Sequence, residues 1–358
     1  MDDLRDFLST IGQEVEDAEE ESFLLFSQSI PSSNLGFVDS KATTIEIPIH
    51  ETEYTIHQSP TLLSSSRAGG TTGAVLWKIT PLFAEWLSST TSNPLWTSSL
   101  LSNTSTVVEL GCGISGLTAL TLSPLIGHYL ATDQEYVARL FRLNLESNPP
   151  PPPSRTKASS SSSSSSKGKA KGNAGSRKQP KTKGRAEVTS SAENGNPNLN
   201  LHPNITFTSL DWETDNPDTL KRQIPVSTSF SDTRGQAEYG KGGEGEEGED
   251  KGFDLLVSCD CIYNEALIAP FVRTCAEISR LRPGYPSEIS GGGSSSGFSG
   301  RRPTICIVAQ QQRSPEVFET WLVETMKYFR VWRVADEVLG SKLGTGSGYL
   351  VHVLVLKG

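Results

Sequence analysis

The sequence predicts an α/β fold with a mainly parallel sheet, because short apolar strands alternate with helical segments along most of the chain. Five such strands are expected, at 106–110, 128–132, 205–210, 253–259 and 304–309. Two further strand-like runs, 331–339 and 349–356, follow one another around a Gly-rich turn. We therefore expect a seven-stranded sheet that ends in an antiparallel hairpin strand at its edge.

Helical periodicity fills the intervals between these strands. The expected helices cover 73–87, 117–126, 135–145, 265–281 and 315–329. The third places Val137, Leu140, Phe141 and Leu145 on one face, and the last begins with a proline, which is favoured in the first helical turn. We expect these helices to wrap the sheet within a domain over 73–358.

The first 72 residues form a distinct, acidic N-terminal extension. Nine of the first 21 residues are acidic. Apolar residues recur among them at helical spacing (Leu4, Phe7, Leu8, Ile11 and Val15), which predicts a short amphipathic helix. Alternating apolar and polar residues at 43–49 and 53–57 then predict a β-hairpin.

Three low-complexity stretches, at 149–200, 231–252 and 284–302, are predicted to be disordered inserts because they lack the apolar residues of a core. Residues 154–185 carry ten Lys and Arg and no acid, although the chain of 358 residues has a net charge of −9. An acidic body argues against a duplex-DNA binder. We interpret the basic run as a solvated loop, with RNA contact as the alternative.

No apolar window is long enough for a transmembrane helix, and no secretory signal is recognisable, so we expect no membrane association. The chain has five cysteines, an odd number without framework spacing. Reduced thiols are typical of the cytoplasm or the nucleus. We expect a cytoplasmic monomer, with the nucleus as the alternative.

A glycine turn between a strand and a helix predicts a nucleoside-type cofactor site. Gly111, Cys112 and Gly113 lie in this turn, and Asp133 ends the next strand, where a carboxylate can accept both hydroxyls of a ribose. These residues alone do not distinguish a dinucleotide from S-adenosylmethionine. Glu109 suits a cationic amino-acid end, the chain lacks a second mononucleotide-binding half, and no dehydrogenase acid–base set follows, so we favour S-adenosylmethionine.

The carboxyl end of the most buried strand carries the candidate catalytic residues. Asp260 and Tyr263 follow this strand, and ligands of open parallel sheets lie beyond such ends. An acceptor there could orient a substrate amine, whereas a helix cap with a packed tyrosine is the structural alternative. Cys259 and Cys261 lack accompanying ligands, so we expect no metal. Trp212, a tryptophan after the third strand, could stack on the adenine or form a wall beside it.

With these residues noted, the chain resembles the class I, Rossmann-like methyltransferases of the methyltransferase-like 21 group, and within it the fungal ribosomal lysine N-methyltransferase 5 family. The carrying segments are Leu76-Trp77, Val107–Leu117, Asp133, Leu210–Trp212 and Asp260–Glu265. The resemblance implies a protein-lysine N-methyltransferase that uses S-adenosylmethionine, with a ribosomal protein as the expected substrate. It implies cofactor contacts by Trp77, Gly111 to Gly113, Asp133, Trp212 and Cys259. It also implies that Asp260 and Tyr263 match the family's Asp/Glu-x-x-Tyr signature, which is linked to the substrate lysine.

Three rival functions stay open at this stage. The chain could methylate an amine of a nucleic acid, although that class often shows an Asn/Asp-Pro-Pro-Tyr run where this chain has Cys261-Ile262. It could be a catalytically silent scaffold that keeps the methyltransferase fold. An NAD-dependent oxidoreductase is the third.

The insert predictions can be tested by deletion. We expect a chain lacking residues 154–200 to keep a cooperative thermal transition, because this stretch has almost no apolar residues to contribute to a core. Differential scanning calorimetry of the deletion variant beside the full chain measures this. Loss of the cooperative transition would show that the stretch is structural.

Overall fold

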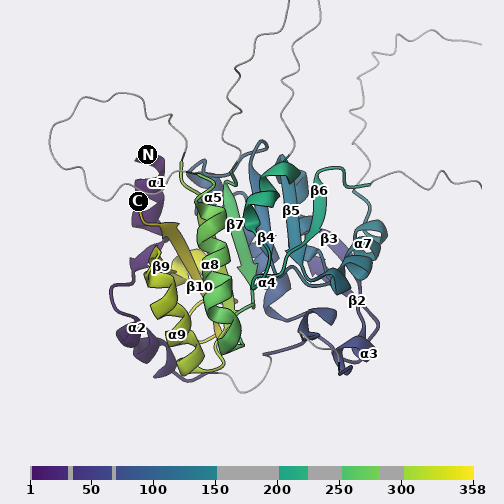
Figure 1. Ribbon diagram of the computed structural model, residues 1–358, viewed down its shortest axis with the longest axis horizontal. Helices are drawn as coiled ribbons and strands as arrows, with labels where there is room; N and C mark the ends of the chain where they lie inside the picture. The colour runs from purple at the N-terminus through teal and green to yellow at the C-terminus, as the bar shows by residue number, and fades with distance from the viewer. Residues whose placement is uncertain (1, 31–34, 67–69, 151–200, 225–251, 283–301) are drawn as a thin grey trace, which may run out of the picture. The chain divides into compact units, whose positions relative to one another are not determined.

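A mixed sheet organises the part of the chain that the structure describes (Figure 1). The structure is a computed structural model that describes residues 2–30, 35–66, 70–150, 201–224, 252–282 and 302–358. Within these ranges, eight strands pair in the order β1-β9-β10-β8-β7-β4-β5-β6. In chain order they are β1 (Gly12–Glu14), β4 (Thr106–Leu110), β5 (His128–Asp133), β6 (Ile205–Ser209), β7 (Leu255–Cys259), β8 (Ile305–Gln311), β9 (Phe329–Val334) and β10 (Tyr349–Leu356).

The strand directions confirm the predicted α/β sheet and correct two details. Strands β6, β5, β4, β7 and β8 are parallel neighbours, in the order of a doubly wound nucleotide-binding fold. The predicted antiparallel strand is β10, but it lies between β8 and β9 and not at the edge. The sheet also has eight strands in the described ranges, not seven, because β1 of the N-terminal extension pairs with β9.

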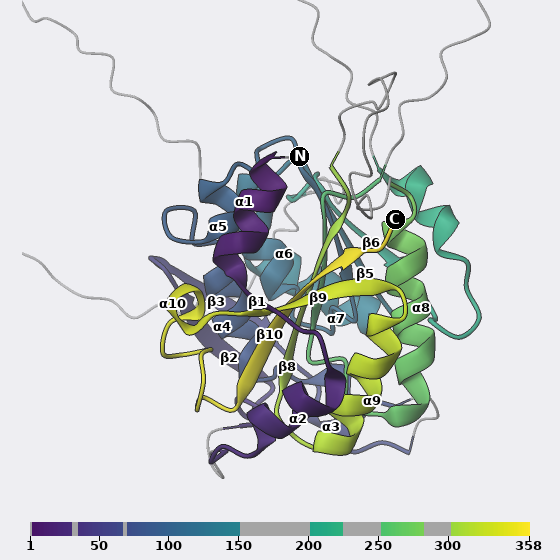
Figure 2. The ribbon, with the colours of Figure 1, turned by 90° about the vertical axis from the view of Figure 1, so that its left-hand side faces the viewer.

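Helices cover both faces of this sheet (Figure 2). One face packs against α1 (Asp2–Ile11), α4 (Ile79–Leu87), α5 (Pro94–Thr97), α6 (Leu117–Leu122) and α7 (Ala138–Ser147). The other packs against α2 (Ala18–Phe26), α8 (Ile268–Ser279) and α9 (Pro315–Met326). The central strands β4 and β7 are thus buried on both faces, as their continuous apolar sequences predict.

Several predicted elements are shorter than the periodicity suggested; the helix expected over 315–329, for example, ends at Met326, and Phe329 begins β9. The helix expected over 73–87 begins only at Ile79, because Gly73 packs on the glycine turn and its carbonyl accepts a hydrogen bond from the Ile114 N–H at 3.0 Å. The strand expected over 331–339 ends at Val334 and is followed by a short helix, α10 (Asp336–Leu339). In that helix, a side-chain oxygen of Asp336 accepts hydrogen bonds from Thr345.

The predicted β-hairpin is confirmed as a separate two-stranded sheet of β2 (Thr44–Ile49) and β3 (Thr52–His57), followed by the short helix α3 (Pro60–Leu63). Two asparagines bind the backbone of β3: Asn144 lies within α7, and Asn148 caps its carboxyl end. The Asn144 side chain accepts from the N–H of His57 and donates to its carbonyl, and Asn148 does the same at Thr55. Since Asn144 also donates to the Ile114 carbonyl, the hairpin, α7 and the glycine turn are tied together.

The acidic N-terminal extension packs into the core through its predicted amphipathic helix. Leu4, Phe7 and Ile11 of α1 are fully buried against the sheet. The acids of the extension lie near arginines of β9: Arg330 donates to both carboxylate oxygens of Glu14, at 2.7 and 2.6 Å. The extension therefore contributes a strand, apolar burial and ion pairs to the sheet edge.

The low-complexity inserts expected at 149–200, 231–252 and 284–302, which include the basic run 154–185, lie outside the described residues apart from their ends. Among the helices that the structure does describe, none has both the length and the apolar character needed to span a bilayer.

The packing of α1 predicts a large difference between two phenylalanines of the extension. Phe7→Ala should lower the free energy of unfolding by about 3–5 kcal/mol, because Phe7 is fully buried and its removal leaves a cavity. Phe23→Ala is the matched control: Phe23 lies on α2, is 72% exposed, and its loss should cost less than about 0.5 kcal/mol. Urea denaturation measures both, and equal losses would contradict the burial of α1.

Candidate functional site

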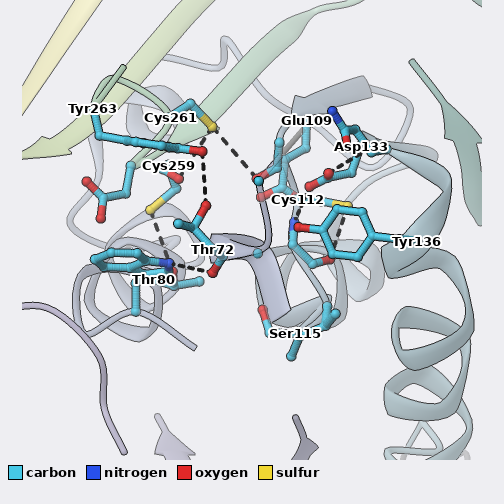
Figure 3. Close-up of a pocket in the computed structure, with 18 of the residues that line it drawn as sticks. Thr72, Thr80, Glu109, Cys112, Ser115, Asp133, Tyr136, Cys259, Cys261 and Tyr263 are labelled. Atoms are coloured by element: carbon cyan, nitrogen blue, oxygen red, sulfur yellow. Dashed lines mark hydrogen bonds between the residues drawn. The ribbon is translucent and has the colours of Figure 1, made fainter. Parts of the chain in front are cut away.

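A cavity lies at the carboxyl ends of β4, β5 and β7, where ligands of doubly wound sheets bind (Figure 3). It encloses about 980 Å³, including the space at its open mouth. All of the residues that the sequence analysis singled out for cofactor or catalysis line it: Trp77, Glu109, Gly111, Cys112, Gly113, Asp133, Trp212, Cys259, Asp260 and Tyr263. The fold thus brings together residues from five separate segments of the chain.

The glycine turn forms the floor of this cavity, and its backbone requires glycine. Gly111 and Gly113 have φ of +71° and +59°, a region that residues with a side chain rarely adopt. A Cβ on Gly111 would lie 2.3 Å from Sγ of Cys261 and 3.4 Å from the Trp212 ring. Glycine at position 111 is therefore required both by the positive φ and by the close packing of Cys261 and Trp212 on the turn.

Asp133 joins the end of β5 to this turn. One of its carboxylate oxygens accepts the Gly113 N–H at 2.8 Å, and the other accepts the N–H of Gln134 at 2.7 Å. Burial raises the pKa of this carboxyl to about 6, while the two backbone hydrogen bonds oppose the rise. A carboxylate has about four acceptor positions, so Asp133 can accept two further hydrogen bonds, the number that a ribose diol donates.

Glu109 lies beneath the turn, at the end of β4. It is 2% exposed, and its carboxylate accepts a hydrogen bond from the Tyr129 hydroxyl at 2.8 Å. Burial raises the pKa of Glu109 to about 7, against the hydrogen bonds from Tyr129 and Thr118 that lower it. Near neutral pH this carboxyl can therefore face the cavity in either protonation state.

Two tryptophans line separate parts of the cavity. The Trp212 ring packs edge-on against Phe271, with 5.1 Å between ring centroids. Its buried Nε1 has no hydrogen-bond partner among the residues that the structure describes. The other, Trp77, is held by its Nε1, which donates to the Thr72 carbonyl, and by the ring of Phe37 at 4.3 Å.

Asp260 is the most constrained residue of the site. It is not a glycine, yet its φ is +62°, and a residue held in this region costs of order 1–3 kcal/mol. Its buried carboxylate is paired with Arg313, which donates one hydrogen bond to each carboxylate oxygen, both at 2.5 Å. The carboxylate that the sequence places beside a substrate amine thus already has a cationic partner.

Tyr263 closes the cavity on the side of the segment that precedes α4. Its hydroxyl is 2.9 Å from the hydroxyl of Thr72, and the ring is 41% exposed (Figure 3). The thiol of Cys259 points to the hydroxyl of Thr80 at 3.9 Å. Because burial raises the pKa of the thiols of Cys259 and Cys112, both are neutral and inert at neutral pH.

Several residues of this site were not found by sequence reasoning. Thr72, Thr80 and Tyr136 line the cavity, but a threonine in a loop or a tyrosine in a helical run carries no signal of its own. Arg313 carried a weak sequence signal, because it follows the carboxyl end of β8, the strand next to β7. Among the described residues, no group of three or more His, Cys, Asp or Glu is placed to hold a metal ion.

The fold and the site together have the features of a class I methyltransferase. These are the order of the strands, the glycine turn after β4 and the carboxylate of Asp133, placed to accept ribose hydroxyls. The comparisons agree with this class. The chain is 41% identical to "Ribosomal lysine N-methyltransferase 5" of Zygosaccharomyces rouxii over 108 residues, which are 26% of this chain and 33% of that protein. It is 30% identical to the Candida glabrata protein of the same name over 165 residues, which cover 32% of this chain and 47% of that protein. The resemblance inferred from the sequence is confirmed.

One relative has a different name. Over 135 residues the chain is 36% identical to "Diaminohydroxyphosphoribosylamino-pyrimidine deaminase" of Schizosaccharomyces pombe, and the match covers 37% of this chain and 32% of that protein. The chain thus spans one third to one half of the length of these three relatives. No family model matches it. The solved N-methyltransferase NodS of Bradyrhizobium japonicum is 11% identical, covers 74% of this chain and 89% of its own, and has a TM-score of 0.30, too low to carry an argument.

The buried Glu109 predicts an unusual pH dependence of stability. Because its pKa rises on folding from 4.5 to about 7, the folded chain binds the extra proton between these values, and stability contributed by the protonated form is lost as pH rises through about 7. From pH 5 to pH 8 the wild type should lose about 2–3 kcal/mol more than Glu109→Gln, whose amide can still accept from Tyr129. Urea denaturation at the two pH values measures the difference, and parallel curves would contradict the shift.

Proposed function

We propose that the protein is an S-adenosylmethionine-dependent protein-lysine N-methyltransferase whose substrate is a ribosomal protein. The observation that supports this most is the convergence of the predicted cofactor and catalytic residues on one cavity at the switch point of the sheet. The names of the yeast relatives supply the reaction and the substrate class.

The residues of the cavity fit S-adenosylmethionine, which would supply the methyl group as a sulfonium. Asp133 keeps acceptor capacity for the ribose hydroxyls, and Trp212 has a buried N–H without a described partner. Glu109 lies where a carboxylate can face the ammonium of the amino-acid end. The site thus offers acceptors for the ribose and the ammonium and an aromatic wall.

Asp260 and Tyr263 are the proposed catalytic residues. Methyl transfer requires a neutral amine held in line with the methyl group, and a free lysine has a pKa near 10.4. The residues that flank the space between Asp260 and Tyr263 are a tryptophan, two hydroxyls and a neutral thiol (Trp77, Thr72, Thr80 and Cys259). Weakly polar walls of this kind remove water from a lysine side chain and favour its neutral form.

Deaminase chemistry is not supported by the chain's own residues, although one relative carries that name. Zinc-dependent nucleobase deaminases use an H-x-E motif and a P-C-x-x-C motif. Neither motif occurs anywhere in the 358 residues. We therefore assign the shared segment to the methyltransferase fold, and the name of that relative stays with that protein.

The proposal includes a cytoplasmic monomer, since ribosomal proteins are made in the cytoplasm and the five cysteines are free thiols. A nuclear location, where ribosomal proteins are assembled, is the alternative. RNA contact through residues 154–185 is the alternative to a solvated loop for this basic run.

Cofactor binding gives the first test. Asp133→Ala should weaken S-adenosylmethionine binding at least about tenfold, because it removes the only charged acceptor proposed for the ribose. Isothermal titration calorimetry of both proteins measures this, with Asp336→Ala as a control, because Asp336 lies on α10 and is not among the residues that line the cavity. Unchanged affinity in Asp133→Ala would contradict the assignment, and no heat with the wild type at millimolar ligand would favour a silent scaffold.

Methyl transfer gives the second test. Radiolabelled S-adenosylmethionine, incubated with the purified protein and lysate from cells lacking it, should label a ribosomal-protein band that survives RNase treatment and is absent without the added protein. Mass spectrometry of that band should then find the added methyl groups on lysine. Label that disappears with RNase, without a labelled protein band, would instead support a nucleic-acid amine as the substrate.

A further inference from the structure

Arg313 connects the two sides of the proposed lysine site. Its guanidinium donates to both oxygens of Asp260, donates to Oε1 of Gln311 at 3.1 Å, and lies 4.8 Å from the ring centroid of Trp77. The same Gln311 oxygen accepts the Gly36 N–H, so the arginine is held in turn by the segment that precedes β2.

Arg313 acts from outside the cavity. Asp260, Tyr263 and Trp77 line the cavity itself, whereas Arg313 lines a smaller neighbouring hollow, together with Tyr263. The Asp260 side chain is 1% exposed and that of Arg313 is 25% exposed. The arginine is thus paired with a carboxylate of the cavity without lining the cavity itself, and it can influence an amine there without touching it.

The charge of this pair matters for a lysine. A bare buried carboxylate beside the amine would favour the ammonium form, which has no lone pair and cannot accept a methyl group. A carboxylate already balanced by a guanidinium exerts a much weaker field on the amine. Asp260 accepts two hydrogen bonds from Arg313 and one from the Gln311 N–H at 3.2 Å, which leaves about one of its four acceptor positions for the amine. The same pair also offsets the cost of holding Asp260 at a positive φ.

We propose that Arg313 is a positioning residue that balances the charge of Asp260, so that a substrate lysine reacts as its neutral amine and is not retained as an ammonium ion. This inference rests on the proposed methyltransferase function. The deprotonated nitrogen would form the new bond to the methyl carbon as the bond from sulfur to that carbon breaks, giving S-adenosylhomocysteine, and the proton lost beforehand passes to solvent.

Other titratable groups also face this corner. They are Cys259 and Cys261 of the β7 exit, Tyr263, Tyr349 of β10, Glu109 of β4 and Asp133 of β5. The two carboxyls titrate near pH 7 and 6, and burial raises the pKa of the thiols and tyrosines. Arg313 lowers the pKa of Tyr349, so R313Q would move that pKa further above its ordinary value of 10.0, away from the pH range of the measurement. A change in the pH midpoint near neutrality between variants therefore reports the arginine.

The first measurement uses n-butylammonium as a probe of the lysine site and requires no turnover. At pH 7, R313Q should bind this cation about tenfold more tightly than the wild type, because the substitution exposes the charge of Asp260. The rise in melting temperature is measured at increasing concentrations of n-butylammonium chloride. Equal concentrations of potassium chloride serve as the control for ionic strength. The matched control is R330Q, since Arg330 also forms a two-bond pair with a carboxylate, Glu14, and lies 5.0 Å from a tryptophan ring, but at the sheet edge. It should behave as the wild type.

The second measurement is the pH profile of the single-turnover methyl-transfer rate, with enzyme in excess over ribosomal proteins from cells lacking the protein. This rate reports ionisations in the enzyme–substrate complex. For R313Q, the midpoint of the ascending limb, where the amine loses its proton, should move up by at least about one pH unit, with an about tenfold slower rate at pH 7 that recovers at high pH. R313K keeps the charge and should keep the wild-type midpoint at a lower maximal rate, since it cannot form two parallel hydrogen bonds.

A folded R313Q with wild-type butylammonium affinity and an unchanged midpoint would overturn the role of Arg313. So would an R313K midpoint displaced by a full unit, and this comparison decides the matter if R313Q does not fold. Absence of any methyl transfer by the wild type would instead contradict the proposed function, while the butylammonium comparison would still report the charge balance at Asp260.

Discussion

The hydrogen bond from the Gly113 N–H to the carboxylate of Asp133 is the contact on which the site depends. It joins the exits of two neighbouring parallel strands, β4 and β5, at the point where the chain must turn sharply to begin α6. The carboxylate is half-buried at the edge of the cavity, where partial removal from water strengthens the bond and raises the pKa of Asp133. A turn held in this way keeps its remaining backbone groups directed at the cavity without a ligand present.

Packing around this turn extends the same constraint outward. The Ile114 N–H binds the carbonyl of Gly73, and Asn144 of α7 binds both the Ile114 carbonyl and the β-hairpin. The segment before α4 is therefore fixed beside the cavity, where Thr72 meets Tyr263. Features that look independent in the sequence, such as the hairpin, the asparagine of α7 and the two catalytic candidates, are parts of one connected structure.

The sequence was most informative where a physical rule links residue order to position. Parallel strands place their carboxyl ends at one edge, so Asp133, Trp212 and Asp260 could be expected in one cavity although 127 residues separate the first from the last. It was least informative where contacts depend on tertiary packing. The pairing of Arg313 with Asp260 requires that β7 and β8 be neighbours, and β1 is too short, at three residues, to show a strand pattern.

The pairing of β1 with β9 has a consequence for synthesis. Glu14 and Arg330 form an ion pair across 316 residues of chain, so the edge of the sheet is completed by two segments that are synthesised far apart in time. Until β9 has been synthesised, β1 has no strand to pair with. A long delay before non-local strands can pair slows folding and exposes unpaired strand edges to other chains.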